Sequence, residues 1–527
     1  MKHTVVKLAA ALAAFAASAY AQPYATTIKP LDGEKWWGVA SFFGENMPYG
    51  NFAEKDIAAS NYSNQADPFF LSSKGRYIWS DKPFKFFVNN GEITIVSDFE
   101  ELKPVAAGST LRDAFLAASK KHFPPTGTIP PELFFTAPQY NTWIELQRNQ
   151  NQAGIEKYAE DIVKNGFPVG VFMVDGGWQK YQGNYEFRPE AFADPKAMFA
   201  KIKSLGFKSI LWVAPFVSPD SAEFRALKKK GVLLPRKSRN TPAILEWWSG
   251  CSAAYDLTKP EGAKSLADTL REMQKTYGMD GFKFDAGDVS FVVGDYKFFK
   301  PEMLPVDYCR AWSQFGKEFP YNEFRATHRM GGQPIVVRLQ DKLHTWRDLR
   351  KTVADMLAIS LLGYPYSCPD MIGGGDFVSF QPGAKLDERL IVRSCQAHAL
   401  MPMMQFSVAP WRVLSKQNME ICRNFANLHV KFAPYFLELA RHASKTGEPI
   451  VRYMEYEFPN QGFENCKDQF MLGSKYLVAP VLNESDFREV VIPAGEWKDD
   501  LGNILKGPTK IKIDAPIERL PYFEKIK

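Results

Sequence analysis

The chain has 527 residues, of which 45% are hydrophobic and 24% are charged, and its formal net charge is +6. This composition excludes an intrinsically disordered chain and predicts a globular protein of several domains, while so mild a charge gives no reason to expect a nucleic-acid partner. The six cysteines form no CxxC motif and the seven histidines are dispersed, which argues against a zinc site and a disulfide framework. We therefore expect no metal and no cofactor.

Residues 1–21 have the pattern of a secretory signal peptide. Lys2 and Lys7 flank an apolar run over 8–17, and Ala19-Tyr20-Ala21 forms a small-x-small cleavage site. An uncleaved membrane anchor is the alternative, but the apolar run is too short to span a bilayer. Cleavage would lower the net charge from +6 to +4. We predict an exported protein, periplasmic or secreted, with no membrane span after cleavage and with its oligomeric state left open.

Short strands and turns dominate residues 22–127. The runs 86–88 and 93–96 are joined by Asn89-Asn90-Gly91, which predicts a β-hairpin around an Asn-Gly turn. Four prolines between residues 122 and 131 then exclude helix and central strand, because proline removes a backbone donor and fixes φ. We predict an all-β N-terminal domain over residues 22–127.

Residues 128–442 alternate short apolar runs with amphipathic helical patterns, which is typical of βα units in a parallel sheet. Helical patterns over 155–165 and 195–205 each end at a glycine, a residue that readily closes a helix. Eight strands are predicted, at residues 133–137, 169–174, 209–214, 281–284, 324–330, 335–339, 361–366 and 401–406. Eight such units predict a (β/α)8 TIM barrel. Strand patterns return over 443–527 and predict a C-terminal all-β domain.

Acidic residues follow four of the predicted strands: Asp175, Asp285, Asp341 and Asp370. Parallel barrels keep their active sites at the carboxyl ends of the strands. Because a charge buried in a barrel mouth is costly unless it is paired or solvated, this accumulation indicates a functional site. Tryptophans, among them Trp212, accompany the acids, and tryptophan walls with charged rims suit sugars; any single tryptophan could equally belong to the core.

One of these strands ends directly on Asp285. Strand side chains alternate between faces, so Lys283 shares the face of Asp285, and a neighbouring cation favours the ionised carboxylate. An ionised Asp285 suits a nucleophile, and Asp341 would be the proton donor of a two-carboxylate glycoside hydrolysis. The alternatives are a structural ion pair between Lys283 and Asp285, and a loop carboxylate at Asp341 that pairs with Lys342 or Arg347.

Longer motifs follow one another along the barrel and identify a resemblance. They are Trp247-Trp248-Ser249-Gly250, Phe282-Lys283-Phe284-Asp285-Ala286-Gly287-Asp288, Arg338-Leu339-Gln340-Asp341, Pro369-Asp370-Met371-Ile372-Gly373-Gly374 and Met401-Pro402-Met403-Met404-Gln405-Phe406-Ser407. In this order they resemble glycoside hydrolase family 31, and within it the branch that contains bacterial α-galactosidases and the myogenesis-regulating glycosidase.

The resemblance implies a retaining α-glycosidase whose barrel lies between two β-sandwich domains. Asp285 falls on the position of the nucleophile and Asp341 on that of the acid/base. The resemblance also implies a set of residues that hold the hydroxyls of the cleaved sugar or contact that sugar: Asp175, Lys283, Arg338, Asp370, and Trp247 or Trp248.

Departures from the family pattern bear on the sugar. Met173 stands where many α-glucosidases of the family carry a carboxylate, and Ala286-Gly287-Asp288 replaces Met-Asn-Glu after the nucleophile. The acid/base motif is Gln340-Asp341-Lys342 in place of Gly-Asp-Asn. The acid/base motif bears on Asp341 as the proton donor, whereas the differences at Met173 and after the nucleophile disfavour the usual recognition of glucose. We predict an exo-acting α-galactosidase that acts on terminal α-galactosides.

Three alternatives stay open. The same fold and mechanism could serve a glucoside, xyloside, N-acetylgalactosaminide or sulfoquinovoside, because pocket contacts decide the sugar. A metal-dependent barrel enzyme would use Asp175, Asp285 and Asp370 as Mg²⁺ ligands and Lys283 as a base. A sugar-binding protein without catalysis is the third, since a fold does not guarantee an activity.

Overall fold

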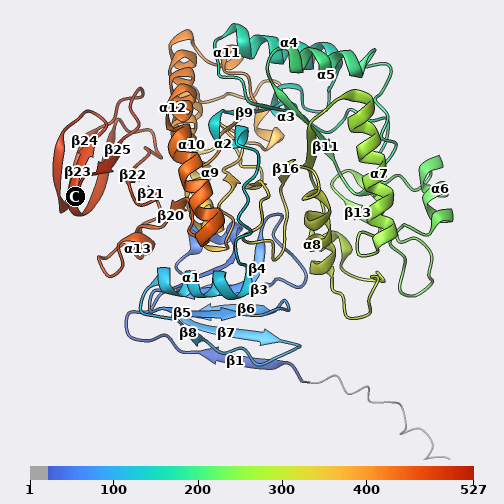
Figure 1. The fold of residues 1–527 in the computed structure, drawn as a ribbon. Coiled ribbons are helices and arrows are strands. Elements are labelled where there is room, and N and C mark those ends of the chain that lie inside the picture. The colour runs from blue at the N-terminus through green and yellow to red at the C-terminus, as the bar shows by residue number, and fades with distance from the viewer. Residues whose placement is uncertain (1–21) are drawn as a thin grey trace, which may run out of the picture.

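The structure is a computed structural model that describes residues 22–527 (Figure 1). The predicted signal peptide lies outside the described residues. Figure 1 shows a central barrel with a sheet-rich N-terminal domain below it and a C-terminal sheet at its side. Over residues 22–527 no helix combines the length and the apolar character that a bilayer crossing requires.

The N-terminal domain contains two antiparallel sheets of four strands, ordered β1-β7-β6-β3 and β2-β4-β5-β8. The strands are β1 (Tyr24–Ile28), β2 (Trp36–Ala40), β3 (Phe52–Asp56), β4 (Ala66–Ser72), β5 (Arg76–Trp79), β6 (Lys85–Asn89), β7 (Glu92–Ser97) and β8 (Val105–Ala106). The predicted hairpin is confirmed, since β6 pairs with β7 around Asn90 and Gly91, whose φ values of 48° and 80° fit a type I′ turn. The domain is not all β, because it also contains helix α1 (Leu111–His122), which Thr110 caps. The sequence prediction missed this helix.

The predicted eight-stranded parallel barrel is confirmed. Its strands are β9 (Gln139–Asn141), β10 (Val171–Val174), β11 (Lys208–Val213), β15 (Gly281–Phe284), β16 (Tyr321–Phe324), β17 (Val337–Arg338), β18 (Ser367–Cys368) and β19 (Gln405–Phe406). They pair in the order β18-β17-β16-β15-β11-β10-β9-β19, and a parallel bridge between Met371 and Gln405 joins the two ends. The carboxyl ends of all eight strands therefore meet at one mouth.

Three predicted strand positions were wrong. The run 133–137 contains helix α2 (Leu133–Thr136), and the first barrel strand is β9 instead. The run 361–366 starts at the last residue of helix α9 (Trp346–Leu361) and ends just before β18. The fifth strand ends at Phe324, where the predicted strand begins. The run 361–366 is buried throughout, so its sequence lacks the period that tells helix from strand.

Helices cover the outside of the barrel (Figure 1). The longer ones are α4 (Gln152–Lys164), α5 (Pro195–Ser204), α7 (Pro260–Tyr277), α8 (Pro305–Gly316), α9, α10 (Glu388–Ala399) and α12 (Lys416–Thr446). Between β11 and β15 the chain forms a small antiparallel sheet of β12 (Phe216–Val217), β13 (Leu245–Trp247) and β14 (Gly250–Ala254). Helix α12 continues to Thr446, past the domain boundary predicted after residue 442.

The C-terminal domain is built on one antiparallel sheet of six strands in the order β20-β21-β22-β25-β23-β24. They are β20 (Val451–Arg452), β21 (Phe470–Leu472), β22 (Tyr476–Val478), β23 (Phe487–Asp499), β24 (Ile504–Asp514) and β25 (Tyr522–Lys525). Buried Trp497 belongs to the apolar core of this domain. The edge strand β24 exposes Lys506, Lys510 and Lys512, and exposed lysines discourage pairing of an edge with another chain.

Candidate active site

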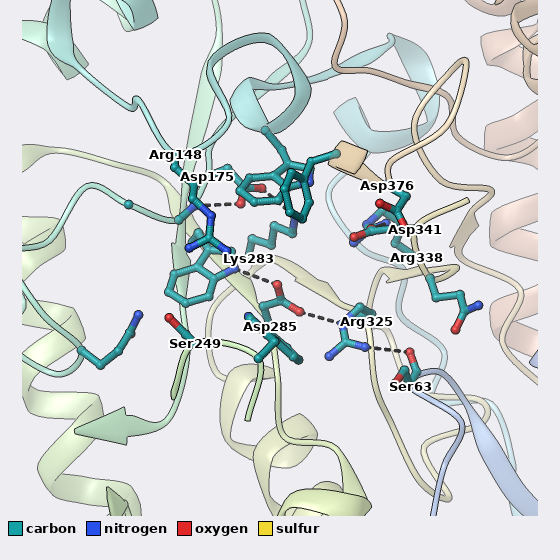
Figure 2. Close-up of a pocket in the computed structure, with 18 residues that line it drawn as sticks. Ser63, Arg148, Asp175, Ser249, Lys283, Asp285, Arg325, Arg338, Asp341 and Asp376 are labelled. Carbon is teal, nitrogen blue, oxygen red and sulfur yellow. Dashed lines mark hydrogen bonds and ion pairs between the residues drawn. The ribbon is translucent and has the colours of Figure 1, made fainter. Parts of the chain in front are cut away.

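A pocket of about 760 Å³ lies at the carboxyl ends of the barrel strands (Figure 2). We call it the strand-end pocket, and it is lined by Ser63, Trp143, Arg148, Asp175, Gly176, Gly177, Gln182, Trp212, Trp248, Ser249, Lys283, Asp285, Arg325, Arg338, Gln340, Asp341, Asp376 and Phe377. The lining therefore joins residues of the barrel, of its loops and of the N-terminal domain.

Asp285 presents a part-buried carboxylate that is held from two sides. Arg325 Nε donates to Oδ1 and Trp212 Nε1 donates to Oδ2, each at 2.8 Å (Figure 2). The backbone N–H of Ala286 also donates to Oδ1, at 2.9 Å. Burial raises the pKa of Asp285, but Arg325, Lys283 and the hydrogen bonds outweigh it and hold this pKa well below its usual value. The carboxylate is therefore ionised and fixed in orientation.

Arg325 is one of the pocket residues that the sequence reasoning missed. It follows β16 directly, donates to Asp288 Oδ2 at 2.6 Å and to the carbonyl oxygen of Ser63 at 3.0 Å, and lies 4.7 Å from the ring centre of Trp248. The predicted strand 324–330 placed Arg325 inside a strand. Had that strand ended at Phe324, Arg325 would have joined the polar groups at the strand ends.

Lys283 pairs with Asp175 rather than with Asp285. Its Nζ donates to Asp175 Oδ2 at 2.7 Å, and both side chains are buried at the base of the strand-end pocket. Burial lowers the pKa of Lys283, but the negative charges of Asp175, Asp285 and Glu323 together outweigh it and the pKa is raised. A lysine that stays protonated cannot act as a base, and Asp175, Asp285 and Asp370 each contact a different protein cation. The arrangement does not support the magnesium-site alternative.

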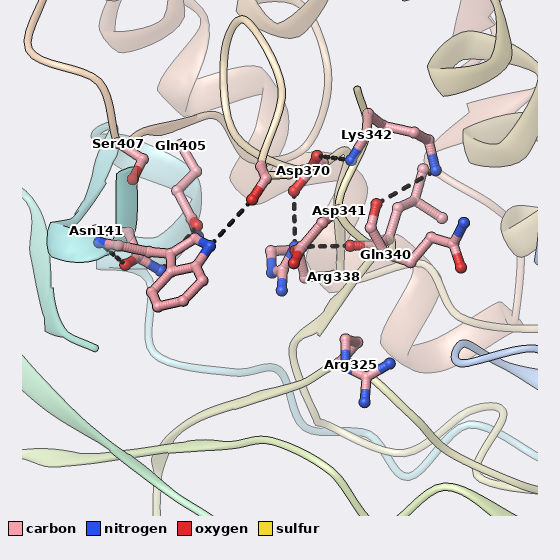
Figure 3. Close-up of polar contacts among 12 residues, drawn as sticks. Asn141, Arg325, Arg338, Gln340, Asp341, Lys342, Asp370, Gln405 and Ser407 are labelled. Atoms are coloured by element: carbon pink, nitrogen blue, oxygen red, sulfur yellow. Dashed lines mark hydrogen bonds and ion pairs between the residues drawn. The ribbon is translucent and has the colours of Figure 1, made fainter. Parts of the chain in front are cut away.

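Asp341 and Asp370 share one arginine nitrogen (Figure 3). Arg338 Nη1 donates to Asp341 Oδ1 at 2.8 Å and to Asp370 Oδ1 at 2.6 Å. The side chain of Asp341 is 39% exposed and lines the strand-end pocket, whereas Asp370 is buried behind it and is absent from the lining. The backbone N–H of Lys342 donates to the other oxygen of Asp370 at 2.8 Å.

The two predicted tryptophans take different places. Trp248 lies in the turn between β13 and β14, is 50% exposed and lines the strand-end pocket. Trp247 is buried, donates from Nε1 to Ser252 Oγ at 3.1 Å and packs against Phe216. Of the two, only Trp248 can contact a ligand in the pocket as it stands.

The pocket thus brings together six of the eight predicted site residues, and Trp247 and Asp370 lie behind its wall. Trp143, Arg148, Asp376 and Phe377 complete the opposite wall and were not predicted. They lie in the segments after β9 and β18, where Trp143 belongs to the short helix α3 (Thr142–Leu146) and Phe377 to a single 3-10 turn, and such short elements have no period that would mark them in a sequence.

Comparison with known proteins gives consistent matches. The sequence model of the glycosyl hydrolases family 31 TIM-barrel domain matches residues 128–439, and that of the family 31 C-terminal domain matches residues 447–526. The chain is similar to the myogenesis-regulating glycosidase of Mus musculus, with 29% identity over 80% of this chain and 60% of that protein. It is also similar to the α-xylosidase XylQ of Lactiplantibacillus pentosus, with 26% identity over 70% and 50%.

Among solved structures, a dextranase of family 31 from Flavobacterium johnsoniae in complex with glucose has the same fold, with a TM-score of 0.83 and 20% identity. The match covers 96% of this chain and 67% of that one. The chain spans 50 to 60% of the length of the two curated relatives. Because the family's barrel model matches more than half of the sequence, the chain belongs to glycoside hydrolase family 31.

Proposed function

We propose that this protein is a retaining, exo-acting α-glycosidase in which Asp285 is the nucleophile and Asp341 the acid/base. One observation carries the proposal. The part-buried carboxylate of Asp285, which Arg325 and Trp212 keep ionised, lines the same pocket as the more exposed carboxylate of Asp341. Hydrolysis with retention needs one carboxylate that attacks and one carboxyl group that gives and takes a proton.

In the first step Asp285 attacks the anomeric carbon while Asp341 gives a proton to the leaving oxygen, so the glycosidic bond breaks and a β-linked glycosyl-enzyme forms. In the second step Asp341 takes a proton from water, which displaces Asp285 and releases the α-sugar. Two inversions give net retention. The two carboxyl groups should lie about 5–5.5 Å apart when a substrate is bound.

The base of the strand-end pocket supports exo action. The buried pair of Asp175 and Lys283 closes the pocket at the barrel interior, so a sugar chain could enter only by one end. Charged groups paired with each other there can hydrogen-bond sugar hydroxyls, and Trp248 offers an apolar face to the ring.

For the sugar itself, we propose a terminal α-galactoside. Met173, which stands at the carboxylate position of many α-glucosidases of the family, is fully buried below the strand-end pocket and contacts Asn141 and Gln405. No carboxylate reaches the pocket from that position, which speaks against the usual contact with glucose. Glucosides, xylosides, N-acetylgalactosaminides and sulfoquinovosides are the competing substrates.

The test compares initial rates on aryl α-galactoside, α-glucoside and α-xyloside for the wild type, Asp285→Ala and Asp341→Ala. We expect a preference for the galactoside, no turnover by Asp285→Ala, and a loss of about 10²–10⁴-fold in Asp341→Ala on a substrate with a poor leaving group. Asp268→Ala removes an exposed helix carboxylate and serves as the control. Binding without turnover that Asp341→Ala leaves unchanged would instead identify a sugar-binding protein.

We also propose that the protein is exported, on the pattern of residues 1–21. The mature N-terminus of the protein expressed with its full sequence should then be Gln22. Sequencing of that terminus checks the cleavage, and a terminus at Met1 would contradict it.

A further inference from the structure

Asp341 and Asp370 contact the same nitrogen of Arg338, and a sugar-binding role for Asp370 does not explain this shared contact. One nitrogen, Arg338 Nη1, is within 2.8 Å of Asp341 Oδ1 and within 2.6 Å of Asp370 Oδ1. A methyl group added to Gly375 would lie 2.7 Å from Asp370 Oδ1 and 3.2 Å from Asp341 Oδ1. The two oxygens therefore border the same small space, which only a glycine leaves free.

Asp370 is built to face this space and cannot reach the strand-end pocket as it stands. It is 1% exposed. The backbone N–H of Lys342 donates a hydrogen bond to one of its carboxylate oxygens, and the guanidinium of Arg338 donates to the other. Its φ of 107° is one that non-glycine residues rarely adopt, and such strain is found where a side chain must be held in place. The carboxylate is thus aimed at Arg338 and Asp341.

The charges around Asp370 come from three directions. Arg338 is at the end of β17, Asp341 and Lys342 are in the loop after it, and Glu323 of β16 lies 3.5 Å from Arg338 Nε on the far side. Burial raises the pKa of Asp370 to about 7, an effect that Arg338 opposes and Asp341 reinforces.

We propose that Asp370 is a positioning residue for Asp341: through the shared nitrogen of Arg338 its carboxylate fixes Asp341 and offsets the charge of the arginine. This inference rests on the proposed role of Asp341 as acid/base. Without the charge of Asp370, Arg338 would favour the ionised form of Asp341, because a nearby cation stabilises a carboxylate. An ionised Asp341 has no proton for the leaving oxygen.

The test is Asp370→Asn, measured as kcat/KM on two glycosides of the same sugar. A glycosyl fluoride needs little help from an acid, whereas an alkyl glycoside needs a proton on its leaving oxygen. We expect a loss on the order of 10- to 100-fold on the alkyl glycoside, part of what general acid catalysis contributes, and at most a few-fold loss on the fluoride. The basic limb of the pH profile should move to lower pH.

Two further variants sharpen the result. Gly375→Ala must displace the same pair of oxygens and should show the same difference between substrates even if Asp370→Asn fails to fold. Asp376→Asn removes a pocket carboxylate that has no contact with Arg338 and should change both rates by one common factor. Equal losses on both substrates in Asp370→Asn, or no loss, would overturn the inference alone. A wild type that cleaves neither glycoside would overturn the proposed function with it.

Discussion

The charge state of Asp285 depends on one residue of the next barrel strand. Arg325 supplies the largest stabilising interaction with the carboxylate, ahead of Lys283 and the hydrogen bond from Trp212. Asp288 and the carbonyl of Ser63 hold the guanidinium in turn, so the cation that keeps the proposed nucleophile ionised is itself fixed.

Replacement of Arg325 should move the acid limb of the activity profile. The attacking carboxylate must be ionised, and the pKa of Asp285 is lowered in the folded protein, so the wild type should lose no nucleophile by protonation above about pH 4. In Arg325→Met the burial of Asp285 is no longer offset, so its pKa should rise and the acid limb of kcat/KM should move to higher pH. Arg325→Lys keeps a cation and should move it less. An acid limb at the same pH in all three proteins would contradict this account.

Sequence reasoning found the site residues that are charged and that also follow an apolar run. Asp175, Asp285 and Asp341 are charged residues at the ends of apolar runs, and burial of such residues needs a reason. Arg325 is also a charged residue at the end of a strand, but the predicted strand ran over 324–330 and placed it inside the strand, whereas β16 ends at Phe324. The burial of Asp370 behind Arg338 depends on backbone geometry at φ 107°, and nothing in the residue order reveals it.

At the scale of the element, helix α9 carries a buried group of charges that supports the acid/base loop. Asp355 lies between two lysines, with Lys342 Nζ at 3.0 Å and Lys351 Nζ at 2.8 Å. Lys342 follows Asp341 directly, and Lys351 also lies 4.3 Å from the ring centre of Phe42 in the N-terminal domain. The helix therefore ties the loop of the proposed acid/base to a neighbouring domain.

Asp355→Ala should lower the free energy of unfolding by about 3–5 kcal/mol, because it leaves buried ammonium groups without their partner. Asp268→Ala on α7 is a matched control, since Asp268 pairs with Lys264 at the same i, i+4 spacing but is exposed. That change should cost less than about 0.5 kcal/mol. Urea unfolding of both variants at pH 7 measures the difference, and similar losses in the two would show that burial is not the cause.

The accuracy of the predicted strand bounds differed from one strand to the next. β15 was located to the residue, and β10 and β11 within two residues, because each apolar run is bounded by polar residues or glycine. The runs at 133–137 and 361–366 also have polar neighbours, Glu132 before the first and Ser360 and Ser367 around the second, so their boundaries do not tell helix from strand. Tertiary packing placed a helix in the first and only the end of a helix in the second.

At the scale of the whole molecule, the N-terminal domain reaches into the site. The side chain of Asn64 is fully buried and donates to the carbonyl oxygens of Arg325 and Arg338, at 3.1 and 3.2 Å, and accepts from the backbone N–H of Gln340 at 3.2 Å. One amide thus links the backbone of β16 and β17 at the places where both leave the barrel.

Asn64→Ala should lower the free energy of unfolding by about 2–4 kcal/mol, because the carbonyl oxygen of Arg338 and the N–H of Gln340 each lose a hydrogen bond, while the carbonyl oxygen of Arg325 keeps only the one from Gln65. It should also lower kcat/KM, since Arg325 and Arg338 would lose their common support. Asn51→Ala removes an exposed side-chain contact in the same domain and should leave both quantities near the wild-type values. A stable Asn64→Ala protein with full activity would show that the domain only covers the barrel.

The place of Ser63 and Asn64 has a consequence for how the protein becomes active. These residues are synthesised before any strand of the barrel, yet the pocket wall that Ser63 completes and the backbone that Asn64 holds exist only after β16 and β17 have formed. Specific activity is therefore a measure of domain docking: a refolding sample should regain barrel helicity first and turnover later, and the interval between the two is the time that docking takes.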